Sequence, residues 1–240
     1  MSVTSRSRSR RAMPPGAARP APDTLARPLP APRHPGRTRV AVAALKRQPR
    51  FAACAAQAAE RLAALDGIDL LGGPAPTEMT AGEVPAVLTA DVDVLFAAGH
   101  SYDSRWINGS TPDSFVGVEL ADLDGPLRAP VLVAYTCSGA SRRFRASLAA
   151  LRPADLPPLT LLACDGNAPY THEPLFAPLL KTLLTHGQPA RPWPERLRAA
   201  LSATLASDEV PYRRWERWGV YIVPGTAAPS RPRSSARQEP

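Results

Sequence analysis

Five short apolar runs that alternate with helical patterns constrain most strongly what this chain can fold into. The runs are residues 40–45, 68–71, 92–98, 131–136 and 159–164. Continuous apolar runs of this length are typical of strands that are buried on both faces. Helical spacing of apolar residues predicts helices over 51–65, 141–151, 176–185 and 194–206, and a last strand is predicted over 219–223. A capping box of Thr80 and Glu83 predicts the start of a short helix that continues through Leu88. Strands that alternate with helices predict an α/β fold, a mostly parallel sheet of about six strands with helices on both faces.

The two ends of the chain differ in composition from the middle. Residues 1–38 are rich in Arg, Ser, Pro and Ala and nearly lack large apolar side chains, and residues 226–240 share this composition. Such segments bury too little apolar surface to offset the entropy lost on ordering. We therefore expect two disordered tails around a single domain over residues 39–225.

The net charge of +8 comes from the N-terminal tail. Residues 1–39 carry nine arginines and a single acidic residue, Asp23, whereas the rest of the chain holds equal numbers of acidic and basic residues. A folded body without excess positive charge does not attract phosphate backbones. We therefore expect no specific nucleic-acid binding, and we expect the aromatic residues of segment 212–221 to complete the core instead.

The sequence also predicts no targeting segment, no disulfide framework and no metal site. The chain has no run of about 18 apolar residues and no apolar segment after the N-terminal arginines, which predicts neither a membrane helix nor a secretory signal. We expect a cytoplasmic protein without membrane contact. Cys54, Cys137 and Cys164 show no C-x-x-C spacing, so free thiols are expected rather than a disulfide framework or zinc site. No metal ion or cofactor is predicted.

Reactive residues follow three of the predicted strands directly. His100 follows the third strand, Cys137 the fourth and Asp165 the fifth. Ligands of open parallel sheets bind beyond the carboxyl ends of the strands, and consecutive strands are usually neighbours. His100 and Cys137 are therefore expected to lie close together, which suits a thiol nucleophile with an imidazole base. Gly139 would allow backbone amides to approach the oxygen of a substrate carbonyl.

These segments resemble a known family. The stretches "VDVLFAAGHS", "VLVAYTCSGAS" and "LTLLACDGNAPYTHEPLFAPLLKTLL" are similar to the caspase-like cysteine peptidases (caspases, metacaspases and bacterial CHAT-type domains) over about residues 39–186. The resemblance implies a caspase-like fold, hydrolysis of peptides or proteins and a catalytic dyad of His100 and Cys137. It also implies that substrate is bound by residues beside the dyad and after the fifth strand, namely Gly99, Ser101, Ser138, Gly139 and Asp165.

The chain departs from the family pattern at two positions. Ser101 stands where the family usually has a glycine after the histidine, and it keeps the backbone N–H through which that glycine acts. Tyr135 stands where metacaspases carry an aspartate. Specificity for basic residues would therefore depend on Asp165 alone.

Three alternatives remain open at this point. A caspase fold without catalysis would serve as an interaction module for a protein partner. The spacing Cys137-x5-Arg143 is that of cysteine phosphatases, in which backbone amides and the arginine hold a phosphate. A related thiol hydrolase would combine Cys137 with the adjacent pair His172 and Glu173.

Overall fold

The computed structural model describes residues 36–45, 49–71, 77–79, 84–102, 105–108, 116–120, 123, 125–168, 170–185, 191–207 and 217–226. The strands in these ranges are β1 (Thr38–Leu45), β2 (Ile68–Leu71), β3 (Thr77–Met79), β4 (Val94–Ala98), β5 (His100–Tyr102), β6 (Arg105–Asn108), β7 (Val116–Glu119), β8 (Val131–Tyr135), β9 (Leu159–Cys164) and β10 (Trp218–Val223). The helices are α1 (Pro49–Ala63), α2 (Val84–Leu88), α3 (Arg142–Leu151), the 3₁₀ helix η3 (Tyr170–Leu175), α4 (Phe176–Thr185) and α5 (Trp193–Ala206).

Six strands of the main sheet follow the order β10-β9-β8-β4-β1-β2. The seventh, β3, lies on the same side of β1 as β2: β2 pairs with the first residues of β1 and β3 with the last. All of these pairs are parallel except that of β10 with β9. The prediction of a mostly parallel α/β sheet is thus confirmed. Because parallel strands carry their carboxyl ends to one edge, β4 and β8 end side by side.

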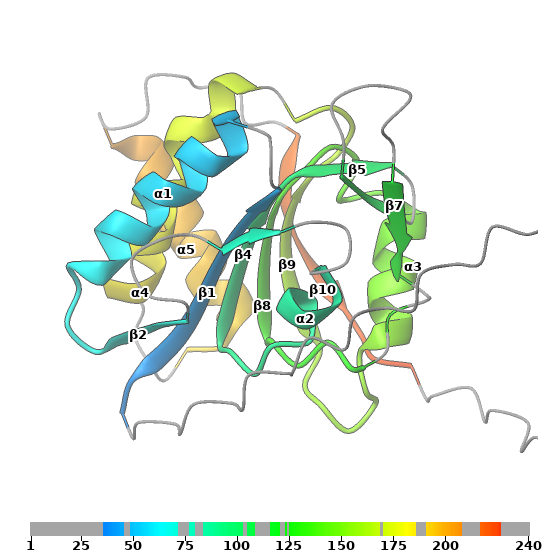
Figure 1. Ribbon diagram of the computed structural model, residues 1–240. Coiled ribbons are helices and arrows are strands. Elements are labelled where there is room, and N and C mark those ends of the chain that lie inside the picture. The colour runs from blue at the N-terminus through cyan, green and yellow to red at the C-terminus, as the bar shows by residue number, and fades with distance from the viewer. Residues whose placement is uncertain are drawn as a thin grey trace, which may run out of the picture.

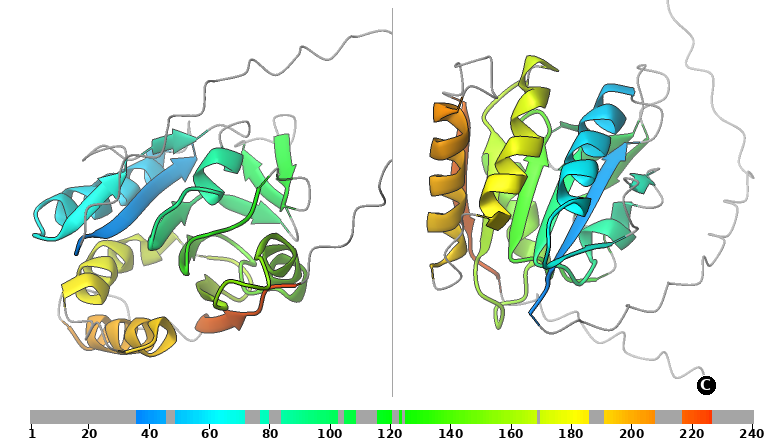
Figure 2. Two further views of the ribbon diagram at one scale, coloured as in Figure 1. Left: turned by 90° about the horizontal axis from the view of Figure 1, so that it is seen from below. Right: turned by 90° about the vertical axis from the view of Figure 1, so that its left-hand side faces the viewer.

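Helices cover both faces of the main sheet (Figures 1 and 2). α1, α4 and α5 form one layer, and α2 and α3 lie on the opposite face beside the small sheet of β5, β6 and β7. The strands separate the two cores by alternation, since successive side chains point to opposite faces. In β1, Val40, Val42 and Ala44 belong to one buried cluster, whereas Ala41 and Ala43 belong to the other.

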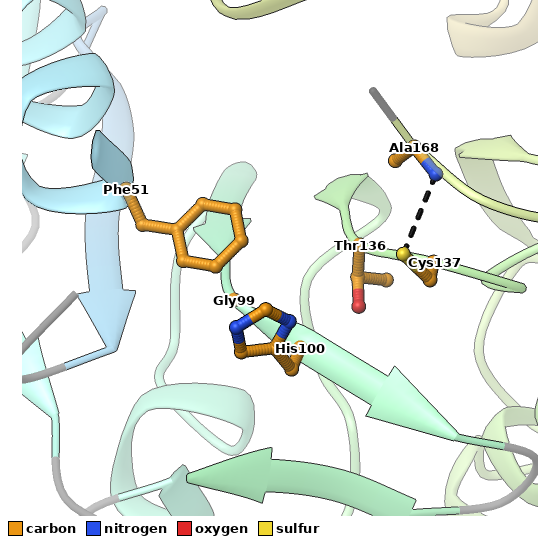
Figure 3. Close-up of a pocket in the computed structure, with 6 residues that line it drawn as sticks. All are labelled: Phe51, Gly99, His100, Thr136, Cys137 and Ala168. Carbon is orange, nitrogen blue, oxygen red and sulfur yellow. Dashed lines mark hydrogen bonds between the residues drawn. The ribbon is translucent and has the colours of Figure 1, made fainter. Parts of the chain in front are cut away.

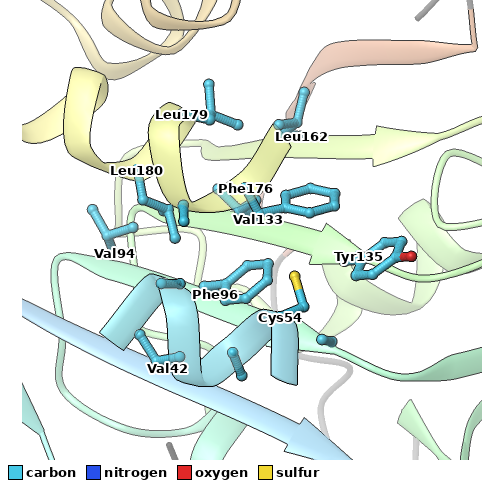
Figure 4. Close-up of a cluster of buried hydrophobic side chains, with 14 of the residues drawn as sticks. Val42, Cys54, Val94, Phe96, Val133, Tyr135, Leu162, Phe176, Leu179 and Leu180 are labelled. Carbon is cyan, nitrogen blue, oxygen red and sulfur yellow. The ribbon is translucent and has the colours of Figure 1, made fainter. Parts of the chain in front are cut away.

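The larger cluster packs α1 and α4 against the strands (Figure 4). On α1, Phe51, Cys54, Ala58 and Leu62 recur every three or four residues and are all buried, as the helical spacing predicted. The small side chains allow α1 to lie close to β1. This packing fixes Phe51, in the first turn of α1, over the carboxyl edge of the sheet.

The segment after β4 differs from the prediction. The sequence predicted a strand that ends at residue 98, with His100 in the connection that follows it. In the structure, β5 begins at His100 and forms an antiparallel three-stranded sheet with β6 and β7. A strand of three residues shows no periodicity, so the pattern of the sequence gives no sign of it. The consequence is that the backbone of His100 is held in a strand pair, opposite Ile107 of β6.

Other predicted features lie at the ends of the described ranges or outside them. Thr38 was assigned to the N-terminal tail, but it is the first residue of β1, and its N–H donates to the carbonyl of Gly67 at 2.8 Å. Thr226 was assigned to the C-terminal tail, but its N–H donates to the carbonyl of Ala149 at 3.2 Å. Tail residues 1–35 and 227–240 lie outside the described residues, as does the predicted capping box of Thr80 and Glu83. Among the described residues, no helix is long and apolar enough to cross a membrane.

A histidine is buried in the core beside β10. The side chain of His172 is 3% exposed, and its Nδ1 accepts a hydrogen bond of 2.9 Å from Nε1 of Trp218. The indole packs edge-on against Phe176 at 5.2 Å between ring centroids. Burial lowers the pKa of His172 from its ordinary value, so the fold favours the neutral imidazole.

We expect this histidine to make the fold sensitive to acid. The unfolded chain takes up a proton near the ordinary histidine pKa of about 6.5, whereas the native state does so only at lower pH, so stability is lost as the pH falls through this window. Urea unfolding at about pH 7.5 and pH 5 should show a lower midpoint at the acidic pH. In His172→Gln, which keeps an acceptor for Trp218 and does not titrate, the decrease should be smaller. Burial also raises the pKa of Glu173, and this shift stabilises the fold as the pH falls. An equal decrease of the urea midpoint in both proteins would contradict the assignment to His172.

Candidate active site

A small pocket opens at the carboxyl edge of the sheet, where β4 and β8 end (Figure 3). Its volume is about 100 Å³, and its described lining consists of Phe51, Gly99, His100, Thr136, Cys137 and Ala168. The pairing of Ala98 with Tyr135 places the next residues of both strands side by side, and the N–H of Gly99 continues the ladder by donating to the carbonyl of Tyr135 at 3.0 Å. The sheet register therefore brings His100 and Cys137 to one pocket.

The turn after β8 presents the half-buried thiol of Cys137. Its Sγ accepts a hydrogen bond of 3.4 Å from the N–H of Ala168. Ser138 adopts a left-handed conformation with φ of 52°, and its N–H donates to the carbonyl of Gly166 at 2.6 Å. The hydroxyl of Ser101 donates to the carbonyl of Cys137. Contacts from the loops after β4 and β9 thus fix the position of the thiol.

The imidazole of His100 lies on the opposite side of the same pocket. Its ring meets the ring of Phe51 edge-on, with 5.0 Å between centroids. Burial lowers the pKa of His100 from its ordinary value, which favours the neutral imidazole, the form that accepts a proton. Within the described residues, no hydrogen bond joins this imidazole to the sulfur of Cys137. The two groups therefore face a common space without touching.

Thr136 lies between His100 and Cys137 in Figure 3. The residue is 1% exposed, and its Oγ1 has no hydrogen-bond partner among the described residues. Leaving a buried hydroxyl unsatisfied costs about 1–3 kcal/mol. A polar side chain of this kind in a pocket indicates a contact for a bound molecule, and the sequence analysis did not single it out. The available signal was a polar residue directly between a buried apolar run and the cysteine.

Gly139 lies where the backbone packs closely against the side chains of Thr136 and Ala163. A Cβ atom added to it would lie 3.1 Å from Cγ2 of Thr136 and 3.2 Å from Cβ of Ala163, and the residue is not among the described pocket lining. The N–H of Ser138 is already donated to Gly166. The N–H of the next residue, Ala140, donates to the carbonyl of Cys164 at 3.0 Å. Gly139 therefore helps to fix the turn after β8.

Asp165 lies outside the pocket. It is exposed at the end of β9, where its N–H donates to the carbonyl of Arg217 at 2.7 Å. From the loop after β9, the pocket receives Ala168 instead. The structure therefore gathers Gly99, His100 and Cys137 at the pocket, keeps Ser101, Ser138 and Gly139 in the segments that support it, and separates Asp165 from it.

The residues of the alternative sites do not line the pocket either. Arg143 is exposed on α3, and His172 is buried against Trp218. In the ranges that the structure describes, no three or more His, Cys, Asp or Glu residues are grouped so that they would hold a metal ion. The described arrangement at the pocket is therefore a thiol that accepts from the N–H of Ala168, an imidazole, and the hydroxyl of Thr136.

Comparison with known proteins adds no relative. No protein-family model matches the chain, and no curated protein matches it.

Proposed function

We propose that this protein is a caspase-like cysteine endopeptidase that hydrolyses peptide bonds with Cys137 and His100. The observation that carries the proposal is that a half-buried thiol and an imidazole with a lowered pKa line one pocket at the ends of two adjacent parallel strands. The resemblance to the caspase-like family assigns the same two residues to the dyad. The alternation of strands and helices is compatible with that family.

The first half of the reaction follows from these groups. His100 accepts the proton of the thiol, and the sulfur of Cys137 attacks the carbonyl carbon of the substrate while the N–H of Ala168 stabilises its negative charge. As the family resemblance implies, backbone N–H groups of the turn around Gly139 donate to the carbonyl oxygen as it becomes negative. The C–N bond then breaks, and the amine leaves with the proton that His100 held.

The second half releases the acyl group. His100 takes a proton from a water molecule, which attacks the thioester carbonyl. The C–S bond breaks, the carboxylic acid leaves, and the proton returns to the thiol of Cys137. No metal ion is needed at any step.

The rate at which limiting iodoacetamide alkylates each cysteine tests this proposal, measured from about pH 5 to pH 9 by mass spectrometry. Cys54 and Cys164 are internal references, because burial raises the pKa of Cys54 above its usual range and that of Cys164 to about 11. We expect Cys137 to react first, with appreciable rate below the ordinary cysteine pKa of about 8.5. In His100→Ala, this rate near neutral pH should fall by about tenfold or more.

Two results would favour the alternatives. If Cys137 reacts rapidly whether or not His100 is present, the dyad is wrong, and hydrolysis of p-nitrophenyl phosphate by the wild type would then test a phosphate-binding loop with Arg143. If Cys137 reacts no faster than a cysteine in a short peptide, the protein is an interaction module without this catalysis.

A further inference from the structure

The pocket at Cys137 has room for only a small group. Pockets for molecules of drug size measure about 300–1,000 Å³, whereas this one measures about 100 Å³. A water molecule occupies about 30 Å³ in the liquid, and an engineered cavity of about 150 Å³ holds one benzene. The space beside the thiol is therefore smaller than the cavity that holds one benzene, and it suits a side chain such as that of alanine, serine or threonine.

The wall that limits this space is held by the core. Phe51 is 4% exposed, and its ring packs edge-on against both His100 and Tyr135, with centroid distances of 5.0 and 5.3 Å. Tyr135 is itself fully buried and lies 4.5 Å from Phe176 between centroids. Because protein cores are close-packed, these ring contacts hold Phe51 in place at the edge of the pocket.

The described lining of the pocket contains no Asp, Glu, Lys or Arg. Asp165, which the family resemblance suggested for this role, is exposed outside it. A charged side chain that enters such a pocket loses water without gaining a counter-charge, which is unfavourable. The unpaired hydroxyl of Thr136 is neutral and gains a hydrogen bond from a polar group that enters.

We propose that this pocket selects a small uncharged residue, alanine, serine or threonine, on the acyl side of the cleaved bond. Phe51 sets the size limit, and the hydroxyl of Thr136 makes the polar contact. This inference rests on the proposed peptidase function and names the substrate class of the same site.

A panel of peptidyl chloromethyl ketones tests the selection on the full-length protein. The probes share one sequence and differ only in the residue next to the ketone, which is Ala, Thr, Asp, Arg or Phe. The thiolate of Cys137 displaces chloride from the methylene carbon, so that an S–C bond forms and a C–Cl bond breaks. The rate of labelling, measured by mass spectrometry, should be about 10-fold to 200-fold higher for the Ala and Thr probes than for the other three.

Variants of Phe51 and Thr136 test the roles assigned to these residues. The quantity compared is the ratio of the labelling rates of two probes, because a general loss of thiol reactivity lowers both rates equally. In Phe51→Ala, the ratio of the Phe probe to the Ala probe should rise by about tenfold or more. The control is Phe144→Ala, because Phe144 is a buried phenylalanine of the opposite core cluster and its loss should leave this ratio unchanged. In Thr136→Val, the ratio of the Thr probe to the Ala probe should fall, and Thr136→Ser should keep it.

The wild-type panel alone is sufficient if Phe51→Ala does not fold. Labelling by the Asp, Arg or Phe probe as fast as by the Ala probe would overturn the inference. So would a protein that no peptidyl probe labels although its reaction with iodoacetamide depends on His100. The proposed function fails in a different way, through an iodoacetamide reaction that does not depend on His100.

Discussion

Replacement of Cys137 by alanine is expected to reduce peptide cleavage by about a thousandfold or more. The sulfur is the atom that forms the bond to the substrate in the proposed reaction, and the loss of a nucleophile removes the covalent route altogether. The other groups at the pocket, including Thr136, remain in place and still bind substrate. The turnover number should therefore fall much more than the affinity. Steady-state hydrolysis of a fluorogenic peptide with alanine before the cleaved bond measures both.

The matched control for this experiment is Cys54→Ala. Cys54 is a buried thiol of α1 whose sulfur donates to the carbonyl of Glu173 at 3.6 Å and which lines no part of the described pocket. Its removal should lower stability slightly and leave the turnover number within about twofold, because it touches no reacting atom. Cleavage that persists in Cys137→Ala would show that another group performs the reaction.

Replacement of Arg152 by methionine is expected to destabilise the fold by about 3–5 kcal/mol. Arg152 directly follows α3 and is 1% exposed. Its Nη1 donates to the carbonyls of Leu127, Arg128 and Ala129, and its Nε and Nη2 both donate to the carbonyl of Pro157. Methionine keeps most of the volume but removes the donor from all four carbonyls. Those of Leu127 and Ala129 are buried, where an unsatisfied acceptor is costly.

Urea unfolding of Arg152→Met and wild type measures this loss. Arg152→Lys should recover only part of it, because an ammonium group does not reproduce the planar fork that reaches both groups of carbonyls. Arg142→Met, at an exposed position at the start of α3, is the control and should change stability by no more than about 0.5 kcal/mol. A loss of less than about 1 kcal/mol in Arg152→Met would show that these hydrogen bonds add little net stability.

The sequence predicted those helices and strands whose pattern of apolar residues is visible within the element itself. β2, β9 and α4 have the predicted bounds, because a continuous apolar run or a helical spacing reports directly which faces of an element are buried. His100 and Cys137 were assigned to one site for a related reason. Each directly follows a recognisable strand, and neighbouring parallel strands end at one edge.

Tertiary structure decided what fills the space beyond those strand ends. Phe51 and Ala168 reach the pocket from α1 and from the loop after β9, and their distances along the chain from Cys137 give no indication of that contact. Asp165 follows β9 as directly as His100 and Cys137 follow their strands, yet its backbone pairs with Arg217 and it remains exposed outside the pocket. The side of the sheet edge on which a residue emerges depends on the path of its loop.

The short elements also depended on contacts between distant segments. β3 has three residues that pair with the end of β1, and β5 has three that pair with β6. Segments this short have no period of their own, so only their partners stabilise them as strands. By itself, the sequence determined the order of the sheet-forming segments and the position of His100 and Cys137 directly after two of them. The tertiary structure decided the size, charge and walls of the pocket, because these properties arise from side chains that packing brings together from separate elements.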